Sequence, residues 1–204
     1  MREVLFASTN SSKLAQFQFV ADTFGFGVTI VSAYKQFPNV EAYGEDYATQ
    51  QEIIEQGSRE IYAQIQTPII VEDTILEVDA LGGRPGLLAN EYLKEKGRAG
   101  LLQEMQNVDQ RMARITSVIG YFDGKECLSF TNRVTGSIAR AESFKKGEPD
   151  WVGPTAIQFG GGFNAIFLLG TTRKTLADFS ANEGLTCGYR EPNFKRLLVF
   201  LSIL

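Results

Sequence analysis

Short runs of apolar residues alternate with polar segments along the first 80 residues, and these runs predict buried strands. The runs occupy residues 4–7, 28–31 and 68–71. The third run ends abruptly at Glu72-Asp73, and an alternating segment at residues 76–79 predicts a further, half-buried strand. The sequence therefore predicts that two adjacent acids stand at the end of a buried strand.

Other segments carry apolar residues at helical spacing. A helix from about Leu14 is expected to stop at Gly25, and a second is expected from about Tyr47. Shorter helices are expected at residues 91–96, 99–105, 175–179 and 193–204. Further strands are expected at residues 113–122, 128–140 and 163–169. Strand–helix alternation followed by neighbouring long strands predicts an α/β domain with a mixed sheet.

Composition narrows the class of protein. The chain has 204 residues, 44% of them hydrophobic, and no internal repeat or linker, so residues 1–204 are expected to form a single domain. A net charge of −4 argues against nucleic acid polymers and anionic membranes as partners. The longest apolar tail, residues 197–204, is too short to span a bilayer. Since Cys127 and Cys187 have no disulfide or zinc spacing, we expect a cytoplasmic protein.

The chain contains no histidine, and this absence excludes several mechanisms. A Ser-His-Asp triad, a Cys-His dyad and a histidine-ligated zinc are all impossible. Any catalysis must therefore use carboxylates, lysine, arginine, hydroxyls or a hard metal ion held by oxygen ligands.

The polar segment between the first strand and the first helix is the first candidate site. It runs from Ser8 through Thr9 and Asn10 to Lys13. A helix N-terminus offers free backbone N–H groups and a partial positive charge, both of which favour phosphate. The alternative is an ordinary helix N-cap by Asn10, Ser11 or Ser12.

Glu72-Asp73-Thr74 is the second candidate, because ligands of open α/β sheets bind at the carboxyl ends of strands. Two adjacent carboxylates repel each other, and Mg²⁺ would relieve that repulsion while holding a triphosphate. The alternative is a solvated turn capped by Asp73. Glu41 lies in an acidic loop that is either functional or simply solvated.

Two later segments could contact a ligand. In Gly160-Gly161-Gly162, backbone could approach a ligand, with Phe159 or Phe163 stacking on a base and Asn164 bonding to it. The alternative is a turn whose aromatic side chain packs in the core. Arg190, which follows Tyr189, could clamp phosphate, read a purine edge or lie on the surface.

Together these segments resemble the inosine triphosphate pyrophosphatase (Ham1-like) family, whose members hydrolyse non-standard purine nucleoside triphosphates. Residues 6–13 resemble the family's T-G-N-x-x-K. Residues 71–74 and 80–86 are similar to its most specific stretch, [AV]-[DE]-D-[ST] followed by A-L-G-G-x-P-G. Residues 163–167 resemble [YW]-D-P-x-F, and residues 174–179 resemble K-T-[FY]-A-E-M. The resemblance covers essentially the whole chain.

The resemblance implies a long mixed sheet with two α/β lobes around a nucleotide cleft, and a homodimer. It implies Mg²⁺-dependent hydrolysis of a nucleoside triphosphate, such as ITP, XTP or dITP, to the monophosphate and pyrophosphate. The implied roles are a triphosphate cradle at Thr9, Asn10 and Lys13, Mg²⁺ ligands at Glu41 and Glu72, water activation by Asp73 and a ligand contact by Thr74.

The chain departs from the family where the base is read. The family's S-H-R motif is Gly188-Tyr189-Arg190 here, and the Asp of its F-G-[YW]-D is Asn164. These changes predict an altered base specificity. Two alternatives stay open: a hydrolase of the same fold acting on another modified nucleotide, and a non-catalytic nucleotide-binding protein.

Overall fold

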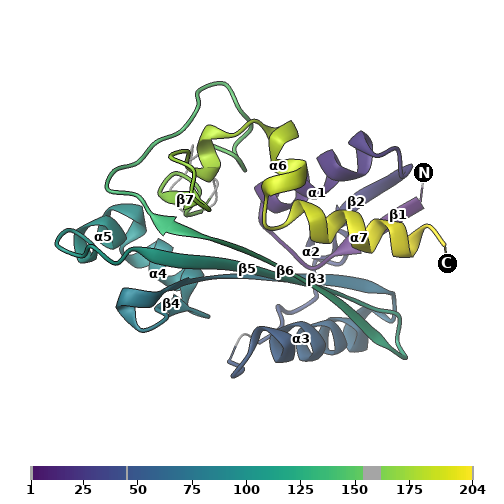
Figure 1. Ribbon diagram of the computed structural model, residues 1–204. Helices are drawn as coiled ribbons and strands as arrows, with labels where there is room; N and C mark the ends of the chain where they lie inside the picture. Colours follow the sequence, from purple (N-terminus) through teal and green to yellow (C-terminus); the bar gives the residue numbers. More distant parts are fainter. Residues whose placement is uncertain (1, 45, 154–161, 204) are drawn as a thin grey trace. The chain divides into compact units, whose positions relative to one another are not determined.

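The computed structural model describes residues 2–44, 46–153 and 162–203, which form a mixed α/β fold (Figure 1). The seven described strands lie in the order β2-β1-β3-β5-β6-β7, with β4 paired to β3. Their bounds are β1 Arg2–Phe6, β2 Val28–Ser32, β3 Ile69–Val78, β4 Pro85–Gly86, β5 Met112–Phe122, β6 Cys127–Ile138 and β7 Phe167–Leu169. β1 pairs in parallel with β2 and β3, whereas β3–β4 and β6–β7 are antiparallel. The predicted mixed sheet is confirmed.

The helices agree with most of the expected segments. Their bounds are α1 Ser11–Thr23, α2 Ala33–Gln36, α3 Gln50–Ile65, α4 Ala89–Glu95, α5 Gly97–Glu104, α6 Ala181–Cys187 and α7 Glu191–Leu201, with 3₁₀ turns at Asp79–Leu81 and Leu176–Asp178. Helix α6 was not expected, although Ser180 and Glu183 form a capping box whose Ser-x-x-Glu pattern is visible in the sequence. None of the described helices has the length and apolar character needed to cross a membrane.

Contacts divide the chain into two compact units. Unit 1 comprises Met1–Asp73, Ser117–Asn132 and Arg190–Leu204, and unit 2 comprises Thr74–Thr116 and Arg133–Tyr189. Strands β3, β5 and β6 each contribute residues to both units.

In unit 1, helices cover both faces of the strands: α1 and α7 lie on one face and α3 lies on the other (Figure 1). On the first face, Phe6 packs edge-on against Phe17, which stacks on Phe194 at a centroid distance of 4.2 Å. On the second face a buried cluster includes Leu5, Ile54, Ile61, Ile69 and Val71. Residues of one strand thus alternate between two apolar layers, which fixes the face of each neighbouring polar side chain.

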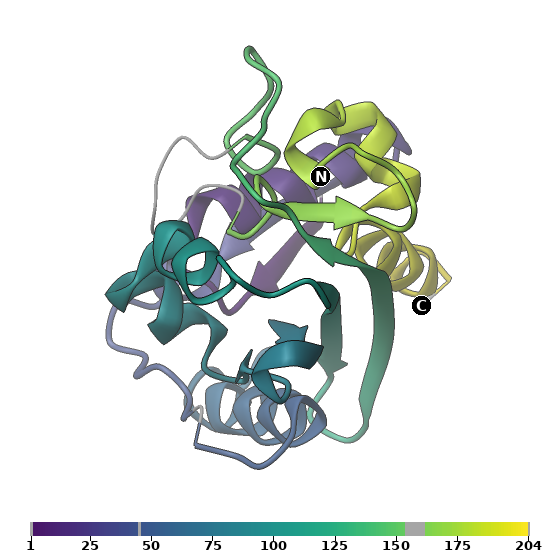
Figure 2. The same ribbon diagram turned by 60° about the vertical axis from the view of Figure 1, so that its left-hand side comes forward.

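Unit 2 has its own core, formed where α4 and α5 lie next to each other (Figure 2) and pack with the strands of this unit. Buried members of this core include Leu76, Val78, Leu101, Met105, Ile115 and Phe167. At Gly136 of β6, a Cβ atom would lie 1.9 Å from the Leu168 carbonyl oxygen of β7, so only glycine allows this pairing.

The predicted strand end at Glu72-Asp73 is wrong, because β3 continues without a break from Ile69 to Val78. The carboxylate of Glu72 is paired and that of Asp73 is hydrogen-bonded, so both acids can lie inside the strand. The strand expected at 163–169 is also shorter and begins only at Phe167. Because successive side chains of a strand point to opposite faces, Glu72 and Asp73 do not face each other. The expected carboxylate pair is therefore divided between two faces.

Candidate functional site

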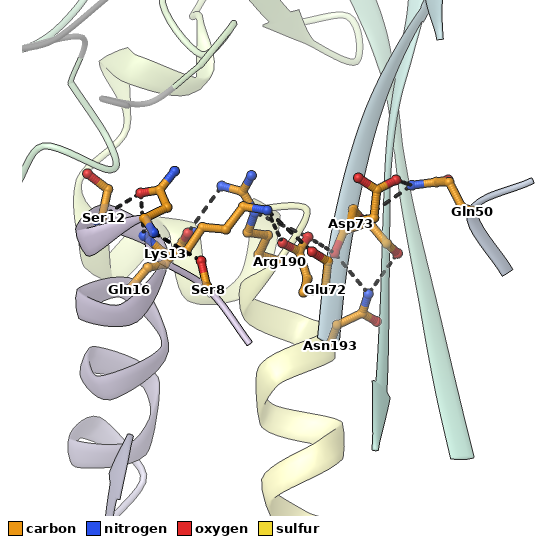
Figure 3. A network of polar contacts seen from close by, with 11 residues as sticks. Ser8, Ser12, Lys13, Gln16, Gln50, Glu72, Asp73, Arg190 and Asn193 are labelled. Carbon is orange, nitrogen blue, oxygen red and sulfur yellow. Dashed lines mark hydrogen bonds and ion pairs between the residues drawn. The ribbon is translucent and has the colours of Figure 1, made fainter. Parts of the chain in front are cut away.

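The buried carboxylate of Glu72 is the centre of a polar network in unit 1 (Figure 3). Its side chain is 0% exposed. Lys13 Nζ lies 2.9 Å from Oε2, and Arg190 Nε lies 3.2 Å from Oε1. The hydroxyl of Ser117 donates to Oε1 at 2.8 Å. Two cations and a hydroxyl thus compensate a charge that burial alone would make very costly.

The topology of unit 1 explains this position. Strands β2 and β3 lie on opposite sides of β1, so the order of the parallel strands reverses at β1, where ligands of α/β sheets usually bind. β1 ends at Phe6, which is paired with Ile70, and Glu72 lies two residues further along β3. The network therefore lies beside the carboxyl end of β1, next to residues 8–13, which the sequence indicated as the first candidate site.

The turn from β1 into α1 brings Lys13 to Glu72. Asn10 is the N-cap of α1, and its Oδ1 accepts hydrogen bonds from the backbone N–H groups of Ser12 at 2.9 Å and Lys13 at 3.1 Å. Ser8 Oγ accepts from the Asn10 N–H at 3.2 Å, and Thr9 is exposed. The Asn10 side chain therefore acts as a helix N-cap, which is the alternative interpretation of this segment. The Lys13 side chain instead forms an ion pair with Glu72.

Replacement of Asn10 by alanine is expected to lower the free energy of unfolding by about 1 kcal/mol, because α1 loses its cap. Thermal unfolding measures this change. Asn10→Ser, which keeps a capping oxygen, is the control and is expected to retain most of the stability. Equal losses in both variants would show that the amide, rather than the cap, matters at this position.

Asp73 points to the other face of β3, toward α3 (Figure 3). Gln50 Nε2 donates to Asp73 Oδ2 at 3.0 Å and to the Asp73 backbone oxygen at 3.2 Å. Gln50 is the first residue of α3, where Thr49 and Glu52 form a capping box. The side chain of the first residue of α3 thus holds the half-buried Asp73 carboxylate in place. Sequence reasoning missed Gln50, although the Thr-x-x-Glu pattern next to it marks this helix start.

A second buried acid lies near the network, on the α7 side. Gln16 Nε2 donates to Glu191 Oε1 at 2.8 Å, and Arg190 Nη1 donates to Gln16 Oε1 in a long hydrogen bond of 3.4 Å. Burial raises the pKa of Glu191, against the hydrogen bond from Gln16 and the charge of Arg190. Asn193 Nδ2 donates to the Ser117 backbone oxygen at 2.9 Å. Of these residues, only Arg190 was predicted from the sequence as a candidate ligand contact. The others could have been found as polar side chains at positions where the helical pattern predicts apolar ones.

The raised pKa of Glu191 predicts a pH dependence of stability. Because the folded state holds this proton more tightly than the unfolded state, the free energy of unfolding falls as pH rises above about 4.5, the ordinary value, toward the folded pKa. Urea unfolding at a series of pH values measures the slope. Glu191→Gln cannot titrate, so the difference between the two proteins isolates this residue, and parallel curves would contradict the assignment.

Glu41, expected beside Glu72, is placed elsewhere in unit 1. Its backbone N–H donates to Gln64 Oε1 at 2.9 Å, and its backbone oxygen accepts from Gln64 Nε2. Gln64 lies 14 residues after Gln50 in α3, which is about 21 Å along the helix axis. The structure therefore brings Glu72 and Asp73 to the carboxyl end of β1 but does not bring Glu41 there.

The remaining expected contacts belong to unit 2. Phe163 and Tyr189 are both buried in the hydrophobic core of this unit, which is the packing role left open for Phe163. Asn164 is buried and donates to the Trp151 backbone oxygen at 2.9 Å. Thr74 is half-buried in β3. The expected contacts at Phe159, Gly160 and Gly161 lie outside the described residues.

Comparison with known proteins identifies the family. The model of the Ham1 family matches residues 4–200. The chain belongs to the Ham1 family. The dITP/XTP pyrophosphatase of Thermococcus kodakarensis is 31% identical over 157 residues, covering 77% of this chain and 75% of that protein. The dITP/XTP pyrophosphatase of Hyperthermus butylicus is 30% identical over 188 residues, covering 89% and 85%. The Ham1 protein of Coxiella burnetii has a similar structure, with a TM-score of 0.79, 23% identity and complete coverage of both chains.

Membership of the Ham1 family agrees with the resemblance found in the motifs. The fold similarity extends over the whole chain, so both units of this Ham1 chain have counterparts in the solved structure.

Proposed function

We propose that this protein hydrolyses a nucleoside triphosphate to the monophosphate and pyrophosphate, in line with the activity named for its relatives. The observation that carries the proposal is the convergence of Lys13 and Arg190 on buried Glu72 beside the carboxyl end of β1. In this reaction a water oxygen bonds to the α-phosphorus, the bond from that phosphorus to the α–β bridging oxygen breaks, and one proton is released from the water.

In this proposal, Lys13 and Arg190 bind the phosphates of the substrate. Lys13 and Arg190 compensate one carboxylate in the free protein, and an arriving triphosphate supplies competing negative charge at the same place. The N-terminus of α1 adds its partial positive charge near Ser8 and Thr9, while Asn10 accepts from the backbone N–H groups of Ser12 and Lys13. Charge developing on pyrophosphate as it leaves is stabilised by such pre-placed donors.

Asp73 is proposed to accept the proton of the attacking water. Beyond the pairing of Phe6 with Ile70, the edge of β3 extends past the end of β1, so a ligand at this edge meets side chains of both faces. Gln50 holds the Asp73 carboxylate in position. A positioned carboxylate of this kind is suited to general base catalysis in a chain without histidine.

Magnesium is proposed to arrive with the triphosphate. Among the described residues, no three acidic or cysteine side chains gather into a metal site. One or two carboxylates are sufficient when phosphate oxygens supply the other ligands, and Glu72 offers hard oxygens of the right type. The ion would neutralise phosphate charge. Glu72 would hold it once Lys13 and Arg190 are attracted to the phosphates, whereas the position of Glu41 does not support the role expected for it.

We also propose that base preference differs from that of inosine and xanthosine nucleotides. Tyr189 stands where the family has histidine, its ring is buried in the core of unit 2, and the next residue pairs with Glu72. The base-reading motif has therefore lost the serine hydroxyl and the imidazole, and only its arginine is kept. The proposal includes a homodimer of one domain spanning residues 1–204, which analytical ultracentrifugation tests directly.

A substrate panel tests the activity. Purified protein is incubated with ITP, XTP, dITP and the common and modified triphosphates, with Mg²⁺, with Mn²⁺ and with EDTA, and pyrophosphate release is measured. Metal-dependent release from at least one triphosphate is expected. Tight nucleotide binding by calorimetry without release would replace the proposal by a non-catalytic binding role.

A further inference from the structure

Gln16 and Glu191 form a buried polar pair next to Arg190, and the chemistry described above does not use this pair. Gln16 is 3% exposed and Glu191 is 6% exposed. They come from α1 and α7, which pack together through the stacked rings of Phe17 and Phe194. The Glu191 carboxyl also accepts hydrogen bonds from the backbone N–H groups of Glu191 and Arg190. The pair is thus a set of polar contacts within an otherwise apolar helix interface, at the place where Arg190 enters α7.

The direction of the hydrogen bonds links the pair to Arg190. The Glu191 carboxyl oxygen accepts from the Gln16 amide nitrogen at 2.8 Å. This contact sets the orientation of the amide and leaves its oxygen facing away from Glu191. That oxygen accepts from Arg190 Nη1 at 3.4 Å, while Arg190 Nε reaches Glu72 at 3.2 Å. The guanidinium thus donates from Nε to Glu72 and from Nη1 to Gln16.

We infer that Gln16 and Glu191 are positioning residues, which together aim the Arg190 guanidinium at Glu72 and at the ligand that competes for it. Arg190 alone has many rotamers, and fixing it before a ligand arrives lowers the entropy cost of binding. Glu191 orients the Gln16 amide and also interacts with the charge of Arg190, and Gln16 contacts the guanidinium through its Oε1 atom. The kinetic consequence rests on the proposed function, whereas the placement of the guanidinium can be tested without turnover.

The decisive variant is the double replacement Gln16→Met and Glu191→Met. It removes both polar partners and also the acceptor of the backbone N–H groups at the start of α7, so the free energy of unfolding is expected to fall, while Arg190 loses the Gln16 acceptor. Two readouts are used: the ¹⁵N–¹H signal of Arg190 Nε, assigned by its loss in Arg190→Lys, and the KM and kcat of the best triphosphate from the panel. We expect a broadened or shifted Arg190 signal and a KM about fivefold to tenfold higher, with kcat nearly unchanged.

Two control variants sharpen the test. Glu191→Gln keeps an accepting oxygen and is expected to retain the wild-type signal and KM. Gln18 lies on α1, as Gln16 does, and its side chain is hydrogen-bonded to Asp22, Val28 and Ile30. Gln18→Met removes these bonds and is expected to lower stability without changing the Arg190 signal or the KM.

An unchanged Arg190 signal and KM in the folded double variant would overturn the inference and leave the pair a packing feature. If the wild type turns over no triphosphate, the proposed function fails, and the Arg190 signal then decides the inference by itself.

Discussion

Glu72→Gln is expected to lower the free energy of unfolding by about 3–5 kcal/mol and to abolish turnover. The amide is nearly the same size as the carboxylate, but it leaves Lys13 and Arg190 beside each other without their shared counter-charge. Its remaining oxygen can still accept from the Ser117 hydroxyl, but its NH₂ group stands where Oε2 contacts Lys13. Urea unfolding measures the loss of stability, and pyrophosphate release measures the loss of activity.

Glu77→Gln is the matched control, because it makes the same chemical change further along the same strand. Glu77 is partly exposed, and its Oε2 lies 3.9 Å from Arg114 Nε and 4.0 Å from Arg133 Nη2. Such pairs are worth less than about 1 kcal/mol. A similar small effect at Glu72 would mean that the two cations are not held by this carboxylate in solution.

Asp73→Asn is expected to reduce kcat by about 10²- to 10⁴-fold while leaving the fold intact. Asparagine keeps an oxygen that can accept from Gln50, so the contact with α3 survives. What is lost is the basicity needed to take a proton from water. Steady-state kinetics measure the rate, and a thermal melt of the same sample shows that the protein is folded.

Asp79→Asn, at an exposed acid at the end of β3, serves as the control for this prediction and should keep wild-type activity. Full activity of Asp73→Asn would assign the proton acceptor elsewhere. The first place to look would then be the opposite face of the strand, where Lys13 and Arg190, the cations proposed to bind phosphate, contact Glu72.

Most elements of the fold could be predicted from the chain because they depend on local periodicity. The amphipathic spacing before Gly25 yields α1, and the apolar run at 69–71 yields the first part of β3. The continuation of β3 through Glu72 and Asp73 could not be predicted, because a charged residue inside a strand is tolerated only when distant groups compensate it. Those groups, Arg190 and Gln50, lie 118 and 23 residues away along the sequence.

Within the candidate site, the sequence indicated the types of groups but not their partners. Lys13, Glu72 and Arg190 were expected near a ligand, and the structure joins them in one network. Phe163 and Tyr189 were expected there as well, but aromatic side chains serve a core as readily as a ligand, and both are buried in the core of unit 2.

The sequence by itself determined the family, the mixed α/β class and a mechanism without histidine, because motifs and periodic patterns are local properties of the chain. Only the tertiary structure decided that Glu72 and Asp73 serve opposite faces of β3, and that Gln16 and Glu191, 175 residues apart, meet behind Arg190. The alternation of side chains and the pairing of buried charges both depend on which elements pack together. No spacing along the chain specifies that packing.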